Sequence, residues 1–176
     1  QAQAQTQLTE ATLQTEDGTD QYLTFILDGE DYGVDILRVQ EIKGWEGATP
    51  IPNMPGFILG IINLRGTVVP VIDLRKYFKM KQASYNQTTV VIVVKINDEE
   101  HQSERTMGIV VDAVSEVHNI GKTDLKQAPD LGSVMDMDTI KGLATIEDQM
   151  IIMLDIDHLM NNGVLQALDL EAVAHA

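Results

Sequence analysis

The sequence predicts a mainly β protein made of two small five-stranded β-barrels, with short helices and a C-terminal helix. Short runs rich in β-branched residues recur from Gln21 onward, separated by turn residues. The two halves of the chain also repeat each other in order and spacing, which indicates a duplicated unit. Helix-favouring composition is confined to brief segments and to the Ala/Leu-rich end from Val164.

The expected strands include the runs YLTFIL, VVPVI, TVVIVVKI, GIVVDAV and MIIML. Asp28-Gly29 predicts a tight hairpin after the first of these runs, and the Gly/Pro-rich segment 44–56 predicts a loop. Brief helices are expected at 74–78 and 156–160, each directly after an aspartate that is suited to cap it.

The internal repeat consists of two blocks. In the first block the residues from Tyr32 to Ile42 align with those from Met107 to Val117 at a constant offset of 75. In the second block the residues from Gly60 to Phe78 align with those from Gly142 to Met160 at an offset of 82. Since so small a unit buries only about 60% of its unfolded surface, the two copies are expected to pack on each other and to leave a groove along their seam.

The repeat also sets the expected boundaries. Residues 1–20 are Gln- and Thr-rich and predict a flexible tail. Residues 21–86 are expected to form the first barrel, 87–160 the second barrel, and 161–176 a C-terminal helix and tail.

Composition restricts the possible functions. The net charge of −15 makes nucleic acid or an anionic membrane a poor partner, because acidic surfaces repel phosphates. The chain has no cysteine, so disulfides and thiolate metal sites are excluded, and no apolar run approaches the roughly 20 residues that cross a bilayer. We therefore expect a cytoplasmic protein without direct membrane insertion.

Candidate catalytic groups are few. Asp73 and Asp155 are repeat-related carboxylates of the kind that act together in acid hydrolases, but Leu74 and Ile156 follow them where those enzymes need a small residue. The four histidines lack the spacing of a metal site, and no phosphate-binding glycine loop is present. The sequence thus predicts no enzyme, metal or cofactor, and a degenerate acid hydrolase remains only as an alternative.

A basic run formed by Arg75, Lys76, Lys79 and Lys81 permits a second alternative, a duplicated β-barrel that binds nucleic acid. The favoured interpretation is that these cations form the solvent face of a short helix. Steep salt dependence of binding would distinguish nucleic-acid binding from a protein adaptor.

Glu41 and Arg65 form the last candidate site. The repeat conserves the glutamate as Glu116 but replaces the arginine by Glu147. A binding surface that is used once can diverge in this way, whereas a scaffold requirement favours the same residue in both copies. A bidentate arginine can also pair with Glu41 and still face a partner.

The chain resembles the CheW family of bacterial chemotaxis coupling proteins across residues 20–160. The resemblance rests on YGVDILRVQEI, IPNMPGFILGIINLRGTVVPVIDLR, TMGIVVDAVSEV and IKGLATIEDQMIIMLDIDHLM, in this order. It implies two Src-homology-like barrels and a non-enzymatic adaptor that couples the cytoplasmic tip of a chemoreceptor to the histidine kinase CheA, at membrane receptor arrays.

The resemblance also implies which residues bind. The expected receptor groove contains Leu23, Ile36, Val39, Glu41, Arg65 and Val114. An apolar groove with a charged rim suits a helical partner. The resemblance assigns no individual residues to the surface that meets the regulatory domain of CheA.

Overall fold

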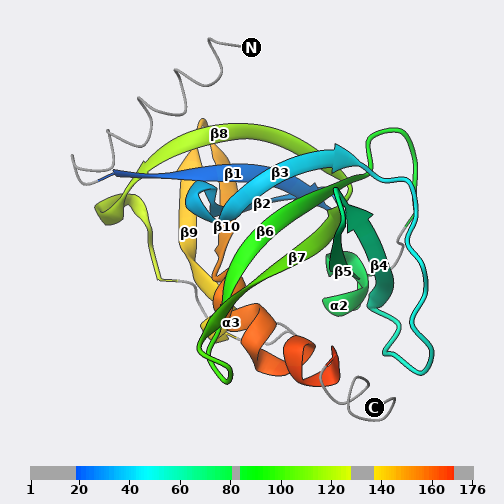
Figure 1. Ribbon diagram of the computed structural model, residues 1–176. Helices are drawn as coiled ribbons and strands as arrows, with labels where there is room; N and C mark the ends of the chain where they lie inside the picture. The colour runs from blue at the N-terminus through cyan, green and yellow to red at the C-terminus, as the bar shows by residue number, and fades with distance from the viewer. Residues whose placement is uncertain (1–18, 81–83, 128–136, 169–176) are drawn as a thin grey trace.

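The computed structural model describes residues 19–80, 84–127 and 137–168 (Figure 1). Most of the predicted tail and the last part of the predicted C-terminal helix lie outside these residues. The end of the predicted tail is not a tail, because residues 19 and 20 already belong to the first strand. Residues 165–168 are helical, which agrees with the start of the predicted terminal helix.

Ten strands form two five-stranded sheets within the described residues, so the mainly β prediction is confirmed. The strands are β1 (Thr19–Leu27), β2 (Glu30–Asp35), β3 (Val39–Gly44), β4 (Ile58–Leu64), β5 (Thr67–Asp73), β6 (Val90–Asp98), β7 (Ser103–Val111), β8 (Ala113–Gly121), β9 (Ile140–Ile146) and β10 (Gln149–Leu154). The first sheet has the order β8-β1-β2-β10-β9, and the second has the order β3-β6-β7-β5-β4. The predicted hairpin at Asp28-Gly29 joins β1 to β2, with both residues at positive φ.

The two sheets are equivalent under the repeat, but they exchange strands. Each strand of one sheet has its repeat mate at the same place in the other, for example β8 and β3 at one end and β9 and β4 at the other. The first half of the chain (residues 19–80) gives β1 and β2 to the first sheet and β3, β4 and β5 to the second. The sheets therefore do not follow the expected division into 21–86 and 87–160.

Neither sheet closes into the predicted barrel among the described residues, since the segments that follow β3 and β8 each reach the opposite end strand through only an isolated bridge. Thr49 bridges Ile61 of β4, and Lys126 bridges Leu143 of β9. The bridges require close backbone approach beside repeat-related glycines. A methyl group on Gly60 would overlap the carbonyl oxygen of Thr49. Each sheet is thus a curled, partly open structure.

Apolar side chains form three clusters. The largest lies between the sheets and contains Phe25 and Val34 of the first sheet together with Ile92 and Ile109 of the second. A smaller cluster around Met153 lies on the other face of the first sheet, and its counterpart around Val71, Val91 and Val110 belongs to the second. The two halves share the largest cluster, as their small size predicted.

Short helical segments connect and cover the sheets. They are η2 (Ile36–Arg38), α2 (Leu74–Tyr77), η3 (Lys122–Asp124), η4 (Met137–Thr139), α3 (Ile156–Leu159) and η5 (Met160–Val164). Figure 1 shows α3 and the helical residues that follow it below β6 and β7. Leu159, Val164 and Leu165 are buried there against the shared core.

Candidate partner-binding surfaces

Glu41 and Arg65 join the two end strands of the second sheet. Glu41 lies on β3 just after a register shift in its pairing with β6. Arg65 lies at the β4–β5 turn, where it and Gly66 have the positive φ of a tight hairpin turn. The Arg65 guanidinium donates to both carboxylate oxygens of Glu41, and this hydrogen bond and charge raise the pKa of Arg65. Arg65 remains 75% exposed, so it faces solvent while it orients the glutamate.

The first sheet lacks this ion pair at the equivalent place. The repeat mates are Glu116 and Glu147, which carry charges of the same sign. Glu147 keeps the positive φ of Arg65, so the turn geometry is retained while the charge is reversed. Glu116 instead lies 3.7 Å from the Nε2 atom of His118. The Glu41–Arg65 pair is therefore a feature that only one of the two equivalent edges can form.

The predicted apolar groove residues all reach the shared core, but they differ in exposure. Ile36, Val39 and Val114 are partly buried and pack against the cluster between the sheets. Leu23 is 3% exposed and is a core residue with almost no surface to offer a partner. All four apolar predicted residues thus belong to or pack against one cluster, and Ile36, Val39 and Val114 keep part of their surface exposed.

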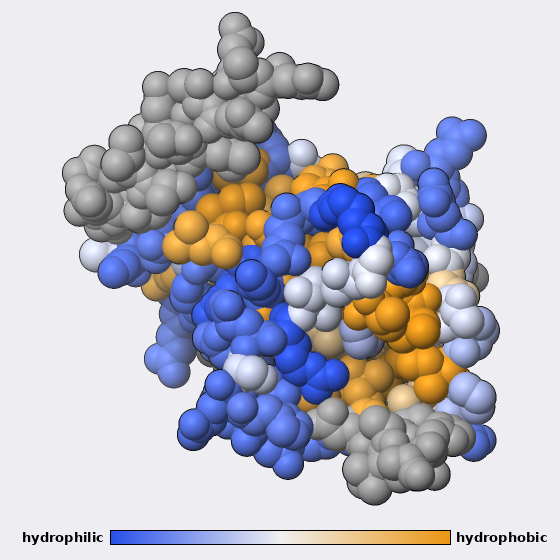
Figure 2. All heavy atoms as spheres, viewed as in Figure 1, coloured by the Kyte–Doolittle hydropathy of each residue, from blue (hydrophilic) through white to orange (hydrophobic). Residues whose placement is uncertain are grey.

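Three exposed apolar residues on η2, β3 and β8 were not among the sequence candidates. Leu37 of η2 is 64% exposed, Ile42 of β3 is 42% exposed, and Val117 of β8 is 41% exposed. Ile42 and Val117 are repeat mates, as are Val39 and Val114. The repeat offset could have found this second pair. Figure 2 shows apolar side chains on the side of the molecule where β3 and β8 run in Figure 1, and a second group where β4, β5 and α2 lie.

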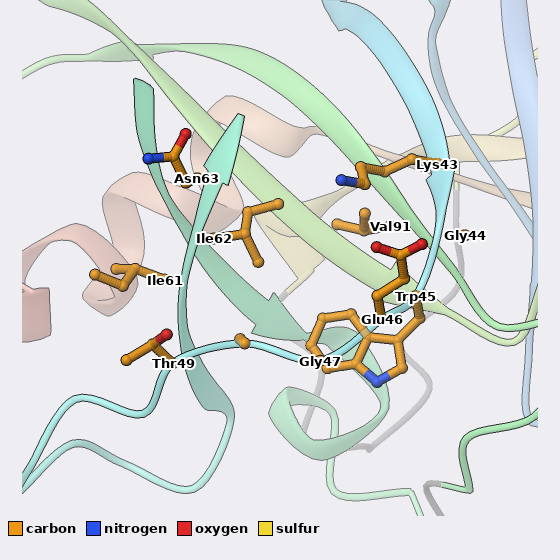
Figure 3. A pocket seen from close by; sticks show the side chains of 11 residues that line it. Lys43, Gly44, Trp45, Glu46, Gly47, Thr49, Ile61, Ile62, Asn63 and Val91 are labelled. Carbon is orange, nitrogen blue, oxygen red and sulfur yellow. The ribbon is translucent and has the colours of Figure 1, made fainter. Parts of the chain in front are cut away.

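A cleft of about 430 Å³ lies between β3 and β4 of the second sheet. Ile62 and Val91 line it together with Lys43, and Trp45 lies at its edge beside Glu46 (Figure 3). Its counterpart between β8 and β9 has a volume of about 230 Å³. The clefts mark the two places where the curled sheets stay open, and the second sheet has the larger opening.

The predicted capping roles of the repeat-related aspartates are confirmed. Asp73 accepts a hydrogen bond from the backbone N–H of Arg75, and Asp155 accepts one from that of His158. Asp73 also forms a buried ion pair with the Arg75 side chain at 2.9 Å. The Asp73 carboxylate is thus held by neighbours, an arrangement typical of a structural role and not of a proton-sharing pair.

The interpretation of Arg75 as a solvent-facing cation is wrong. Its side chain is fully buried and binds Asp73, Asp112 at 2.6 Å and the carbonyl oxygen of Ser84. Burial alone would lower the pKa of Arg75, but the hydrogen bonds that Arg75 donates to its carboxylate partners outweigh burial and raise the pKa above its ordinary value. The sequence could not show this, because Asp112, one of the two carboxylate partners of Arg75, comes from a distant part of the chain.

No group of three or more His, Cys, Asp or Glu residues in the described ranges could hold a metal ion. None of their helices has the length and apolar character to span a membrane.

Comparison with known proteins identifies the family. The CheW-like domain matches residues 21–164. The chain is 39% identical over 155 residues to a chemotaxis protein CheW of Klebsiella aerogenes, covering 88% of this chain and 90% of that protein. It is 33% identical over 150 residues to a chemotaxis protein CheW of Rhizobium meliloti, covering 85% and 93%.

A solved structure agrees with these sequence matches. The scaffolding protein TtCheW from Thermoanaerobacter tengcongensis superposes with a TM-score of 0.72 at 34% identity, covering 81% of this chain and 92% of that one. Sequence and fold agree over most of both chains, and the protein described here belongs to the CheW family.

Proposed function

We propose that this protein is a non-enzymatic scaffold of bacterial chemotaxis that couples the cytoplasmic tip of a chemoreceptor to the regulatory domain of the histidine kinase CheA. Membership of a family whose relatives are named chemotaxis and scaffolding proteins supports this proposal. On this view the protein works in the cytoplasm at receptor arrays. Its activity is equilibrium binding to two protein partners.

The observation that carries the proposal is the apolar seam with its one-sided charged rim. Ile42 and Val117 are exposed on β3 and β8, the strands that carry the partly buried Val39 and Val114, and Leu37 is exposed on η2 just before Val39. An apolar surface with polar surroundings suits the apolar face of a helical hairpin. The Glu41–Arg65 pair adds charges that fix the register and orientation of such a partner.

The nucleic-acid alternative loses its main support in this structure. Its basic run depended on Arg75, which is buried and neutralised by Asp73 and Asp112. The net charge of −15 opposes contact with a phosphate backbone.

The experiment that tests receptor coupling compares Arg65→Glu with Glu147→Lys. Both changes reverse a charge at equivalent hairpin turns, so they match in position and exposure. We expect Arg65→Glu to weaken binding to a purified receptor tip roughly tenfold while the melting temperature stays near wild type. Glu147→Lys should bind as the wild type does.

The readouts are the dissociation constant by calorimetry and the melting temperature of each variant. Full binding by folded Arg65→Glu would remove this site from the proposal. Loss of binding only in step with unfolding would assign the pair a structural role. A pull-down with the CheA regulatory domain tests the other partner, and failure of the wild type to bind either partner would refute the coupling function.

A further inference from the structure

Ion pairs join the two halves of the chain at two corners of the fold. At the first corner Arg75 of α2 pairs with Asp112 at 2.6 Å, at the point where the chain crosses from β7 of the second sheet to β8 of the first. At the second corner Arg38 of η2 pairs with Asp157 of α3 at 2.7 Å, where the chain crosses from β2 of the first sheet to β3 of the second. Both pairs thus fasten a crossover to the helix that ends the other half.

The two corners are the same place in the repeated fold with the charges interchanged. Arg75 and Asp157 are repeat mates at the offset of 82. The repeat mate of Asp112 is Leu37, the neighbour of Arg38. At both corners the first half supplies the cation and the second half (residues 90–168) supplies the anion.

This distribution of charge discriminates between like and unlike halves. The sheets have equivalent strand orders, so backbone pairing alone would allow a first half to pair with another first half. Such a pair would bring Arg75 to a crossover that carries Arg38, and two second halves would bring Asp157 to a crossover that carries Asp112. Like charges that meet away from water repel strongly, because the low dielectric screens them little. Arg75 is fully buried, so its corner has the least access to solvent.

We propose that the seam between the halves is a charge-selective interaction surface, on which each half accepts the opposite half, from its own chain or from a second copy of this chain, and rejects a like half. The duplication thereby keeps a symmetric backbone interface and breaks its pairing symmetry by placing cations on the first half and anions on the second. Chains opened between α2 and β6 then exchange halves without forming like pairs.

The test begins with the full chain. A protease recognition sequence is inserted between residues 82 and 83, and the protein is purified in the folded state and then cleaved. The cleaved protein is unfolded in denaturant and refolded, and native mass spectrometry counts the three possible pairs. Random pairing of equal amounts would place about half of the complexes in like pairs, whereas charge selection should leave unlike pairs in roughly tenfold excess.

The decisive variant is Asp157→Arg, which places an arginine at the repeat mate of Arg75. A second half with this change can pair with its own kind through two corners that resemble Arg75–Asp112. We expect pairs of second halves to appear and unlike pairs to fall. Adding Arg38→Asp in the first half should restore the second corner with its signs exchanged and bring unlike pairs back. Lys76→Asp changes an exposed cation of the same half and should leave the distribution unaltered.

Asp157→Asn provides a milder version should the arginine prevent folding before cleavage, and it should raise the share of like pairs by a smaller amount. An unchanged distribution in both Asp157 variants would overturn the proposal. Random pairing by the wild-type fragments would overturn it as well, and so would failure of the fragments to reassociate at all.

Discussion

The two ends of the repeat show which features of a duplicated fold are kept and which diverge. Asp73 and Asp155 both cap the helix that follows the last strand of their half. Two residues later the first half has a fully buried arginine, while the second has Asp157, which is 21% exposed. Capping is a local backbone requirement that both copies share. The side chain two residues after each aspartate instead forms an ion pair with a residue of the other half, Arg75 with Asp112 and Asp157 with Arg38.

The largest expected difference between the corners concerns stability. Arg75→Ala removes the cation that neutralises the buried Asp73 and leaves Asp112 without this partner, so we expect a loss of about 3–5 kcal/mol in the free energy of unfolding. Asp157→Ala removes a partly exposed ion pair and a hydrogen bond from the backbone N–H of Asn97, and should cost about 1–2 kcal/mol. Urea denaturation of both variants gives the comparison. Equal losses would show that burial does not distinguish the corners.

The isolated bridges beside Gly60 and Gly142 give a second, smaller contrast between the two sheets. Gly60 has a φ of +140°, and a methyl group there would overlap the Thr49 carbonyl oxygen. At Gly142 the methyl carbon would lie 3.0 Å from the Lys126 carbonyl oxygen, where a small shift relieves the contact. We expect Gly60→Ala to cost about 3 kcal/mol and Gly142→Ala about 1 kcal/mol.

Urea denaturation measures this second comparison too. A cost at Gly142 equal to that at Gly60 would mean that both bridges are equally tight.

The sequence predicted those parts of the fold that depend on local pattern. The β-branched runs, the Asp28-Gly29 turn and the capping aspartates correspond to observed strands, turn and helix starts. The offsets of 75 and 82 correctly paired strands such as β3 with β8. The repeat could not show which sheet the hairpin of β1 and β2 joins. A duplicated sequence is equally compatible with two separate barrels and with a fold in which β1 and β2 pair with strands of the second half.

The candidate surface was predictable to a similar degree. The repeat and the family resemblance pointed to Val39 and Val114, which are partly buried against the shared core; their role in binding stays a prediction. Leu23 shows no alternation of buried and exposed neighbours, because Tyr22 and Thr24 beside it are buried too. Its place in the core therefore follows only from the packing of the two sheets. Arg75 was misread because its charged partner Asp112 is distant in the sequence, and a buried arginine looks like an exposed one until that partner is placed.

The smallest expected effect concerns the Tyr85 phenol, which donates a hydrogen bond to Asp73 at the first corner. Burial, and then the bond to Asp73, raise the pKa of Tyr85 from 10.0 to about 12. A raised folded-state pKa means that the protonated phenol stabilises the fold. This contribution is fully present below pH 10 and is lost as the pH rises through about 12. Tyr85→Phe removes it.

Wild type and Tyr85→Phe should therefore differ in stability at neutral pH and converge between pH 10 and 12. The melting temperature of each protein, followed across this range, measures the convergence, and phenolate absorbance reports the titration itself. The variant should lack one late-titrating phenol. Tyr32, whose pKa is also raised, chiefly by burial, is present in both proteins and does not affect the difference. A constant difference in melting temperature across the range would contradict this account, because the phenylalanine ring keeps the packing on Trp45, 5.7 Å away between ring centroids, and only the hydroxyl has been removed.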